Sequence, residues 1–104
     1  MALRLGTLRR MDEDANETPL SYDARVLRAF FRGGLLVSIP AQEKKREVIL
    51  RFLMDRCFAD DRVYPEAEVN ERLGEYNEDV AALRRYLVIA GLMTRARGEY
   101  RRAR

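Results

Sequence analysis

The segment from Val80 to Gly91 constrains the fold most strongly, because it combines a helical repeat with a signal at each end. Apolar residues recur at offsets of 3, 7 and 10 from Val80, which places them on one face of an α-helix. Asn77 is a suitable N-cap before this repeat, and Gly91 is a suitable stop after it. The pattern therefore predicts an amphipathic helix that packs its apolar face on a protein core.

Two short segments after this helix predict a β-hairpin. They run from Leu92 to Arg95 and from Glu99 to Arg102, and Ala96, Arg97 and Gly98 separate them. A connection of this length that contains glycine suits two antiparallel strands.

The preceding segment predicts a second, shorter helix. Pro65 is favoured at the first helical position, and the helix is expected to run to about Tyr76 with Val69 and Leu73 pointing inward. A turn at residues 60–61 and a very short strand over residues 62–64 are expected just before it.

A long helix is predicted from about Ala41 to Cys57. Its buried stripe is formed by Leu50, Leu53, Met54 and Cys57. Its first turns are polar and include a run of three cations over residues 44–46, so this end is expected to be solvated.

The N-terminal part predicts one more helix and a strand. Asp23 is the expected cap of a helix with an apolar face that includes Val26 and Phe30, and glycines 33–34 are expected to stop it. Residues 35–39 predict a strand. Residues 1–20 lack a sustained apolar repeat and are expected to form a mobile tail. A chain of 104 residues suffices for one core, so residues 21–104 are expected to form a single domain.

The order of these elements predicts a fold class. From residue 41 onward the order is helix, short strand, helix, tight turn, helix and hairpin, which is the order of a winged helix-turn-helix. The expected fold is therefore mainly α, in the α+β class, with an extra N-terminal helix and short strand. In such a domain the third helix is presented to the major groove of DNA, and the hairpin contacts the DNA backbone or the adjacent groove.

One part of the charge distribution favours a DNA partner, and another part opposes it. The net charge of the chain is only +3, but residues 80–104 contain seven arginines and one acid, whereas residues 59–79 contain eight acids and two arginines. A basic C-terminal region favours a polyanion such as duplex DNA. The acidic block opposes this partner unless part of it faces away.

The candidate DNA contacts are arginines and lysines in three places. On the third helix, Arg85 lies on the predicted exposed face with Glu78, Ala81, Ala82 and Ile89, and can form a bidentate contact to guanine. Arg84 lies near the edge of this face and is a candidate phosphate contact. The other candidate phosphate contacts are Arg95, Arg97, Arg101 and Arg102 of the hairpin and Lys44, Lys45 and Arg46 of the long helix. The alternative for each is an ordinary solvated cation.

Two other kinds of partner stay open. The same scaffold can serve protein–protein interaction or dimerisation, which the acidic second helix and the candidate exposed residues Val88 and Ile89 favour. Small-molecule sensing between the first helix and the winged helix is a third possibility, for which the sequence indicates no specific residue.

The residue inventory argues against an enzyme. The chain has no histidine and one cysteine, which removes Cys/His zinc sites and histidine-dependent triads. Cys57 falls at helical spacing beside Leu53 and Met54 and is expected to be a packed core thiol. We therefore expect no metal and no cofactor. A single cysteine, no apolar leader at the start and no segment long enough to span a bilayer predict a cytoplasmic location without membrane contact.

The sequence from Val26 to the C-terminus resembles the prokaryotic domain of unknown function family 2087. The similar segments are LRAFFRGGLLVSIPAQEKKREVILRFL, YPEAEVNERL and NEDVAALRRYLVIAGLMTRARGEY. The combination that carries the resemblance is Gly33, Ile39, Pro40, Lys45, Glu68, Val69, Asn70, Asp79, Leu83, Arg84, Arg85, Leu87 and Gly91. The resemblance implies a winged-helix-like fold and an association with transcriptional regulators, but no catalytic residue.

Overall fold

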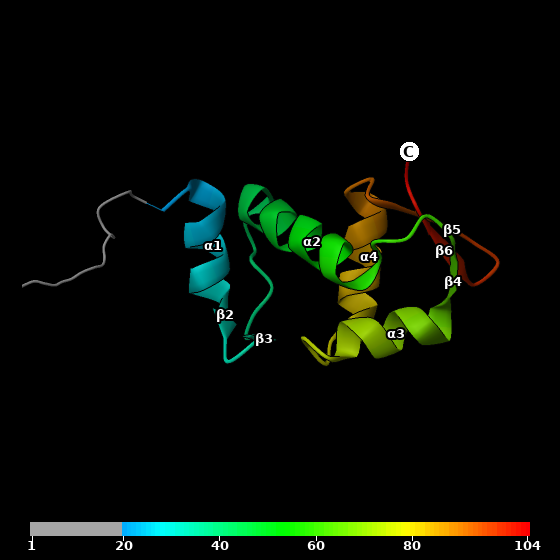
Figure 1. The fold of residues 1–104 in the computed structure, drawn as a ribbon, viewed down its shortest axis with the longest axis horizontal. Helices are drawn as coiled ribbons and strands as arrows, with labels where there is room; N and C mark the ends of the chain where they lie inside the picture. The colour runs from blue at the N-terminus through cyan, green and yellow to red at the C-terminus, as the bar shows by residue number, and fades with distance from the viewer. Residues whose placement is uncertain (1–19) are drawn as a thin grey trace, which may run out of the picture.

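The computed structural model describes residues 20–104, so the predicted tail lies almost entirely outside the described residues. Over the described part, four helices and two small antiparallel sheets form an α+β domain, as Figure 1 shows. In chain order the elements are α1 (Tyr22–Phe30), β2 (Phe31–Arg32), β3 (Leu35–Leu36), α2 (Glu43–Cys57), β4 (Val63–Pro65), α3 (Glu66–Gly74), α4 (Val80–Ile89), β5 (Met93–Ala96) and β6 (Glu99–Arg102).

The N-terminal unit differs from its prediction in its cap, its stop and the length of its strand. The hydroxyl of Ser21, not Asp23, caps α1 by accepting a hydrogen bond from the Ala24 N–H at 3.1 Å. Helix α1 ends at Phe30, and Gly33 and Gly34 form the turn of the β2–β3 hairpin, with φ values of 57° and 81°. Both angles fit the two-residue type I′ turn. The strand predicted over residues 35–39 is only two residues long because its partner, β2, also has only two residues.

Helix α2 forms the centre of the core. The predicted stripe is confirmed, since Leu50, Leu53, Met54 and Cys57 are all buried, together with Ile49. The helix begins at Glu43, two residues later than predicted. In Figure 1, α1 lies beside the N-terminal half of α2, whereas α3 and the three-stranded sheet lie toward its C-terminal end.

The three-stranded sheet has the order β4–β6–β5, with both pairs antiparallel. Tyr64 of β4 and Tyr100 of β6 are opposite each other and buried, and the Phe58 ring packs edge-on against Tyr64. Pro65 ends β4 and precedes α3 as its N-cap residue, so its predicted place as the first helical residue is wrong by one position. Proline is tolerated there because β4 is an edge strand.

The turn between α3 and α4 depends on a partner that is distant in the sequence. Helix α3 ends at Gly74, before the predicted Tyr76. Asp79, not Asn77, caps α4, because its carboxylate accepts from the Ala82 N–H at 3.2 Å. The Asn77 side chain instead accepts from the Asp79 N–H and donates to the Leu36 carbonyl, each at 2.7 Å. Asn77 therefore joins the α3–α4 turn to the β2–β3 hairpin.

The C-terminal hairpin is confirmed with a tighter turn than predicted. Ala96 pairs with Glu99, so only Arg97 and Gly98 connect the strands. Their φ values of 55° and 76° again fit a type I′ turn. Arg97 is thus held at the tip of the hairpin in a left-handed conformation.

Candidate nucleic-acid interface

The exposed side of α4 matches its prediction except at Ala82. Ala81, Arg85 and Ile89 are exposed, whereas Leu83 and Leu87 are fully buried. Ala82 is also buried, with 8% of its surface exposed, so its predicted place on the outer face is wrong.

A hollow of about 300 Å³ lies between α4, the start of α3 and the hairpin. It is lined by Glu66, Ala81, Arg84, Arg85, Val88, Ile89, Arg95 and Tyr100. Three of the predicted contact residues, two from α4 and one from β5, therefore lie on one face of the molecule. The pairing of β5 with β6 places Arg97 in the turn at the tip of the hairpin.

Arg84 lies beneath this face in a network of polar side chains. Its guanidinium donates to the Tyr100 hydroxyl at 3.1 Å and to the Asn70 side-chain oxygen, and lies 3.8 Å from the Glu66 carboxylate. Only 20% of the Arg84 side chain is exposed. These contacts join α4 to α3 and β6. Arg84 therefore stabilises the packing of these three elements.

Glu66 also pairs with Arg95 of the hairpin. The two side chains approach to 3.3 Å, and this hydrogen bond, with the nearby Tyr100, raises the pKa of Arg95 above its ordinary value. Arg95 therefore keeps its charge, and about half of its side chain faces solvent.

Arg101 and Arg102 of β6 have different partners. Arg102 donates to the carbonyl of Phe58 at 2.6 Å and to that of Met54 at 3.4 Å, which anchors the hairpin to the end of α2. Arg101 lies 3.9 Å from the Asp61 carboxylate and is about half exposed. Within residues 20–104, Arg85 and Arg97 have no carboxylate within ion-pair distance. Both arginines are exposed, and the Arg85 guanidinium lies 5.4 Å from the centre of the Tyr86 ring.

Lys44 and Lys45 lie on the side of α2 that faces α1. The Lys44 ammonium is 4.8 Å from the centre of the Tyr22 ring, and Lys45 lines a hollow with residues of α1. Figure 1 shows the N-terminal half of α2 beside α1, away from the β5–β6 hairpin. The structure therefore does not bring the two lysines together with the arginines of α4.

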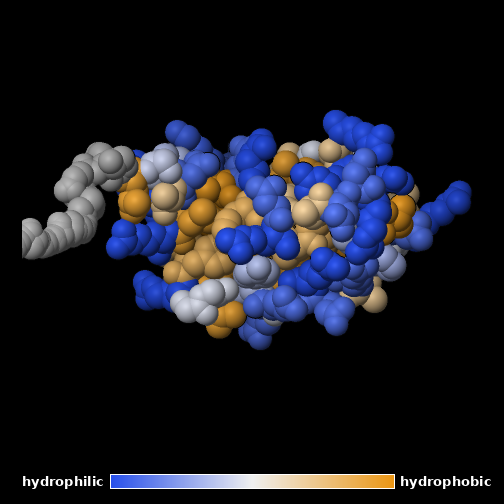
Figure 2. Space-filling view, viewed as in Figure 1, coloured by the Kyte–Doolittle hydropathy of each residue, from blue (hydrophilic) through white to orange (hydrophobic). Residues whose placement is uncertain are grey.

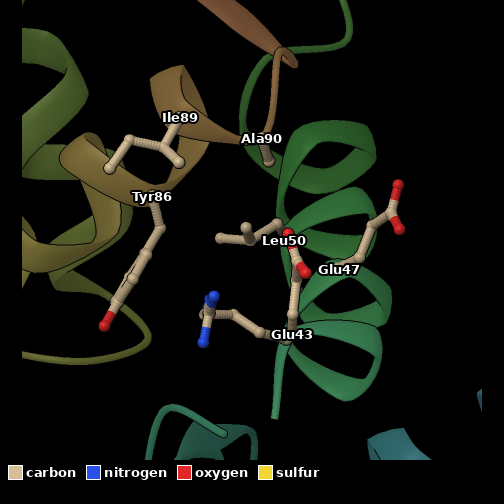
Figure 3. A pocket seen from close by; sticks show the side chains of 7 residues that line it. Glu43, Glu47, Leu50, Tyr86, Ile89 and Ala90 are labelled. Atoms are coloured by element: carbon tan, nitrogen blue, oxygen red, sulfur yellow. The ribbon is translucent and has the colours of Figure 1, made fainter. Parts of the chain in front are cut away.

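Arg46, the third cation of the same run and also a candidate phosphate contact, packs against α4 instead. Its guanidinium donates to the carbonyls of Pro40 and Ala41 and lies 4.3 Å from the centre of the Tyr86 ring. Figure 3 shows the small cleft between α2 and α4, which is lined by Leu50 of α2 and by Tyr86 and Ile89 of α4. No periodicity in the sequence indicates this contact, because it joins two helices.

Three of the eight acids in the acidic block, Asp61, Glu66 and Glu68, pair with arginines. Glu68 pairs with Arg62 at 2.6 Å and with Arg72 at 2.8 Å, and the hydrogen bond from Arg62 lowers the pKa of Glu68. Asp61 pairs with Arg104 at 2.9 Å. The acids closest in sequence to the exposed face of α4 are Glu78 and its cap Asp79, which are both exposed.

Two kinds of site are absent from residues 20–104. No group of three or more histidine, cysteine, aspartate or glutamate side chains is placed to hold a metal ion. In the same part of the chain, no helix has the length and apolar composition that crossing a bilayer requires.

Comparison with known proteins identifies a family. No curated protein and no solved structure matches the chain. Residues 35–102 match the model of a family described as an uncharacterized protein conserved in bacteria, DUF2087. The match begins at β3 and ends with β6, so it leaves out α1 and β2. Because the match covers well over half of the chain, this protein is a member of the bacterial family DUF2087.

Proposed function

We propose that the chain is a winged-helix module that binds duplex DNA through α4 and the β5–β6 hairpin. The order α2, β4, α3, α4, β5, β6 is the order expected of such a module. The three-stranded sheet places the hairpin next to α4, where a wing would lie. We further propose a role in transcriptional regulation, which the family resemblance favours.

The observation that carries the proposal is the single face shared by α4 and β5. Ala81, Arg85 and Arg95 line the same hollow although they come from a helix and a strand. In the proposed complex, Ala81 allows close approach to the major groove and Arg85 contacts a guanine edge. Arg97, at the hairpin tip, contacts a phosphate. Arg84 supports this face from beneath.

The carboxylates of Glu78 and Asp79 set a limit on how α4 enters the groove. Both lie at the N-terminal end of the helix, where a phosphate would be repelled. We therefore propose that the C-terminal half of α4, with Arg85, approaches the bases more closely than the N-terminal end.

Fluorescence anisotropy with labelled mixed-sequence duplex DNA tests the proposal. We expect binding at low salt that weakens as salt rises, because arginines displace counterions from phosphates. The double variant Arg85→Ala/Arg97→Ala should bind about tenfold more weakly or worse, and the slope of log affinity against log salt should fall by about one for each lost phosphate contact.

Arg32→Ala is the matched control, because this exposed arginine lies on β2 at the opposite end of the molecule. Its effect on DNA affinity should be small. Absence of binding at low salt, or equal affinity of the double variant and the control, contradicts DNA binding by this face.

A second candidate function is protein interaction or self-association through the same face. Ile89 is 69% exposed and Val88 37% exposed, and both line the hollow beside α4. Exposed apolar side chains of this kind are typical of the centre of a protein interface. If this candidate is correct, sedimentation should show concentration-dependent association that Ile89→Asp abolishes. Leu35→Asp, at an exposed apolar residue of β3 that does not line this hollow, should leave the association unchanged.

A further inference from the structure

An apolar hollow of about 580 Å³ lies between α1, the β2–β3 hairpin and α2. This side of the domain is away from the β5–β6 hairpin (Figure 1). It is lined by Leu27, Arg28, Phe31, Gly34, Phe52, Arg56 and Tyr76. Its volume lies within the range of small-molecule sites in proteins. Figure 2 shows hydrophobic surface in the region of α1 and α2, with hydrophilic side chains around it.

Three aromatic rings form the wall of this hollow. Phe31 packs edge-on against Phe52, with ring centres 5.1 Å apart, and against Tyr76, with ring centres 6.3 Å apart. All three rings are only partly buried and pack against the core. They therefore present apolar surface to solvent and can take a further ring into the same edge-to-face packing.

The charge of the lining is entirely positive. Arg28 and Arg56 are the ionised residues among the lining side chains, and no carboxylate is included. The Arg56 guanidinium is 5.0 Å from the centre of the Phe52 ring, which places it at the aromatic wall. Within residues 20–104, neither Arg28 nor Arg56 has a carboxylate within ion-pair distance.

We propose that this hollow binds a small aromatic carboxylate. The aromatic body would pack against Phe31, Phe52 and Tyr76, which removes apolar surface of both partners from water. The carboxylate would accept hydrogen bonds from Arg28 and Arg56, since the planar guanidinium matches the two carboxylate oxygens. The proposal does not depend on DNA binding, because the hollow shares no residue with the face of α4.

The site also touches the turn that positions α4. Tyr76 lies in the α3–α4 turn, and its carbonyl accepts a hydrogen bond from the Leu36 N–H at 2.8 Å. A ligand in the hollow would therefore contact α1, α2 and this turn together.

The test uses 2-naphthoate and its neutral analogue 2-naphthamide as probes with the full chain. Isothermal titration calorimetry should show saturable 1:1 binding of 2-naphthoate and at least about fivefold weaker binding of 2-naphthamide, because the amide lacks the charge. Arg28→Gln or Arg56→Gln should weaken 2-naphthoate by about fivefold and leave 2-naphthamide unchanged. Arg32→Gln removes the same charge outside the hollow and should change neither affinity.

The location of binding is tested by amide chemical shifts. Addition of 2-naphthoate should shift the amides of residues 27–34, 52–56 and 76 most strongly. No saturable binding below 1 mM (roughly −4 kcal/mol) overturns the proposal. Equal affinity for both probes, equal affinity of the arginine variants and the control, or shifts centred on α4 and β5 overturn it as well.

Discussion

At the scale of single residues, adjacent arginines on α4 have different roles. Arg84 is mostly buried and bonded to Asn70 and Tyr100, whereas Arg85 is exposed. A buried hydrogen-bond donor that loses its partners carries a cost, and so do the partners that it leaves behind. Arg84 should therefore affect stability, and Arg85 should affect binding.

The predicted effect of Arg84→Ala is a loss of about 1–3 kcal/mol in the free energy of unfolding. The variant leaves Asn70, Glu66 and Tyr100 without their shared donor. Urea unfolding measures this loss, and Arg85→Ala is the matched control that should stay within about 0.5 kcal/mol of the unchanged chain. Equal stability of the two variants would show that the Arg84 network contributes nothing.

Cys57 provides a pH-dependent prediction. Burial raises the pKa of its thiol from 9.0 to about 11, so the folded state disfavours the thiolate. The resulting stabilisation is fully present below pH 9 and is lost as the pH rises from 9 to about 11. The free energy of unfolding should fall more steeply over this range in the unchanged chain than in Cys57→Ala, which lacks the thiol. Parallel pH profiles of the two proteins would contradict this assignment.

At the scale of elements, the C-terminal hairpin combines an unfavourable conformation with a candidate contact. Arg97 has a φ of 55°, although asparagine or glycine is favoured at this position of a type I′ turn. A left-handed conformation costs an ordinary residue roughly 1–2 kcal/mol. The presence of arginine here is consistent with a role at the tip of the hairpin.

Replacement of Arg97 by asparagine should therefore separate stability from binding. We expect Arg97→Asn to raise the free energy of unfolding by about 0.5–1 kcal/mol, because asparagine tolerates this conformation. DNA affinity should fall, because the candidate phosphate contact is lost. Urea unfolding and anisotropy measure the two effects, and Arg95→Asn in the adjoining strand should give no gain in stability. Higher stability with unchanged DNA affinity would remove Arg97 from the proposed interface.

At the scale of the whole molecule, α1 and β2 belong to the core although the family match leaves them out. Val26 of α1 is buried, and Phe31 of β2 packs against Phe52 and Tyr76. Because the β2–β3 hairpin is bonded to the α3–α4 turn, this N-terminal unit also supports the position of α4.

Removal of residues 1–34 should destabilise the matched segment. The truncated chain loses the aromatic cover of Phe52 and Tyr76 and the pairing partner of β3. We expect a loss of more than about 2 kcal/mol in the free energy of unfolding. Exposing the apolar surface of Phe52 and Tyr76 should cost as much as replacing a large core side chain by alanine. Thermal and urea unfolding measure it. An unchanged midpoint would show that residues 35–104 fold independently of α1 and β2.

The fold could be predicted from the sequence where the signal is local. The buried stripe of α2, the inward-facing Leu83 and Leu87 of α4 and the hairpin follow from periodicity and end signals, which act within a few residues. The length of β3 and the role of Asn77 could not be predicted in this way, whereas the α1 cap was misassigned although its bond joins residues only three positions apart. The α4 cap was misassigned because Asn77 is bonded to Leu36, 41 positions away.

The sequence by itself determined that α4 has one apolar and one basic side and that a basic hairpin follows it. Each of these patterns involves only residues of a single element. Only the tertiary structure decided which arginines are accessible. The partners that bury Arg84 lie 14 and 16 positions away, on α3 and β6. The apolar hollow under α1 was likewise decided by tertiary packing, since it brings together residues from Leu27 to Tyr76. Contacts between distant residues depend on how the elements pack, and no local pattern records them.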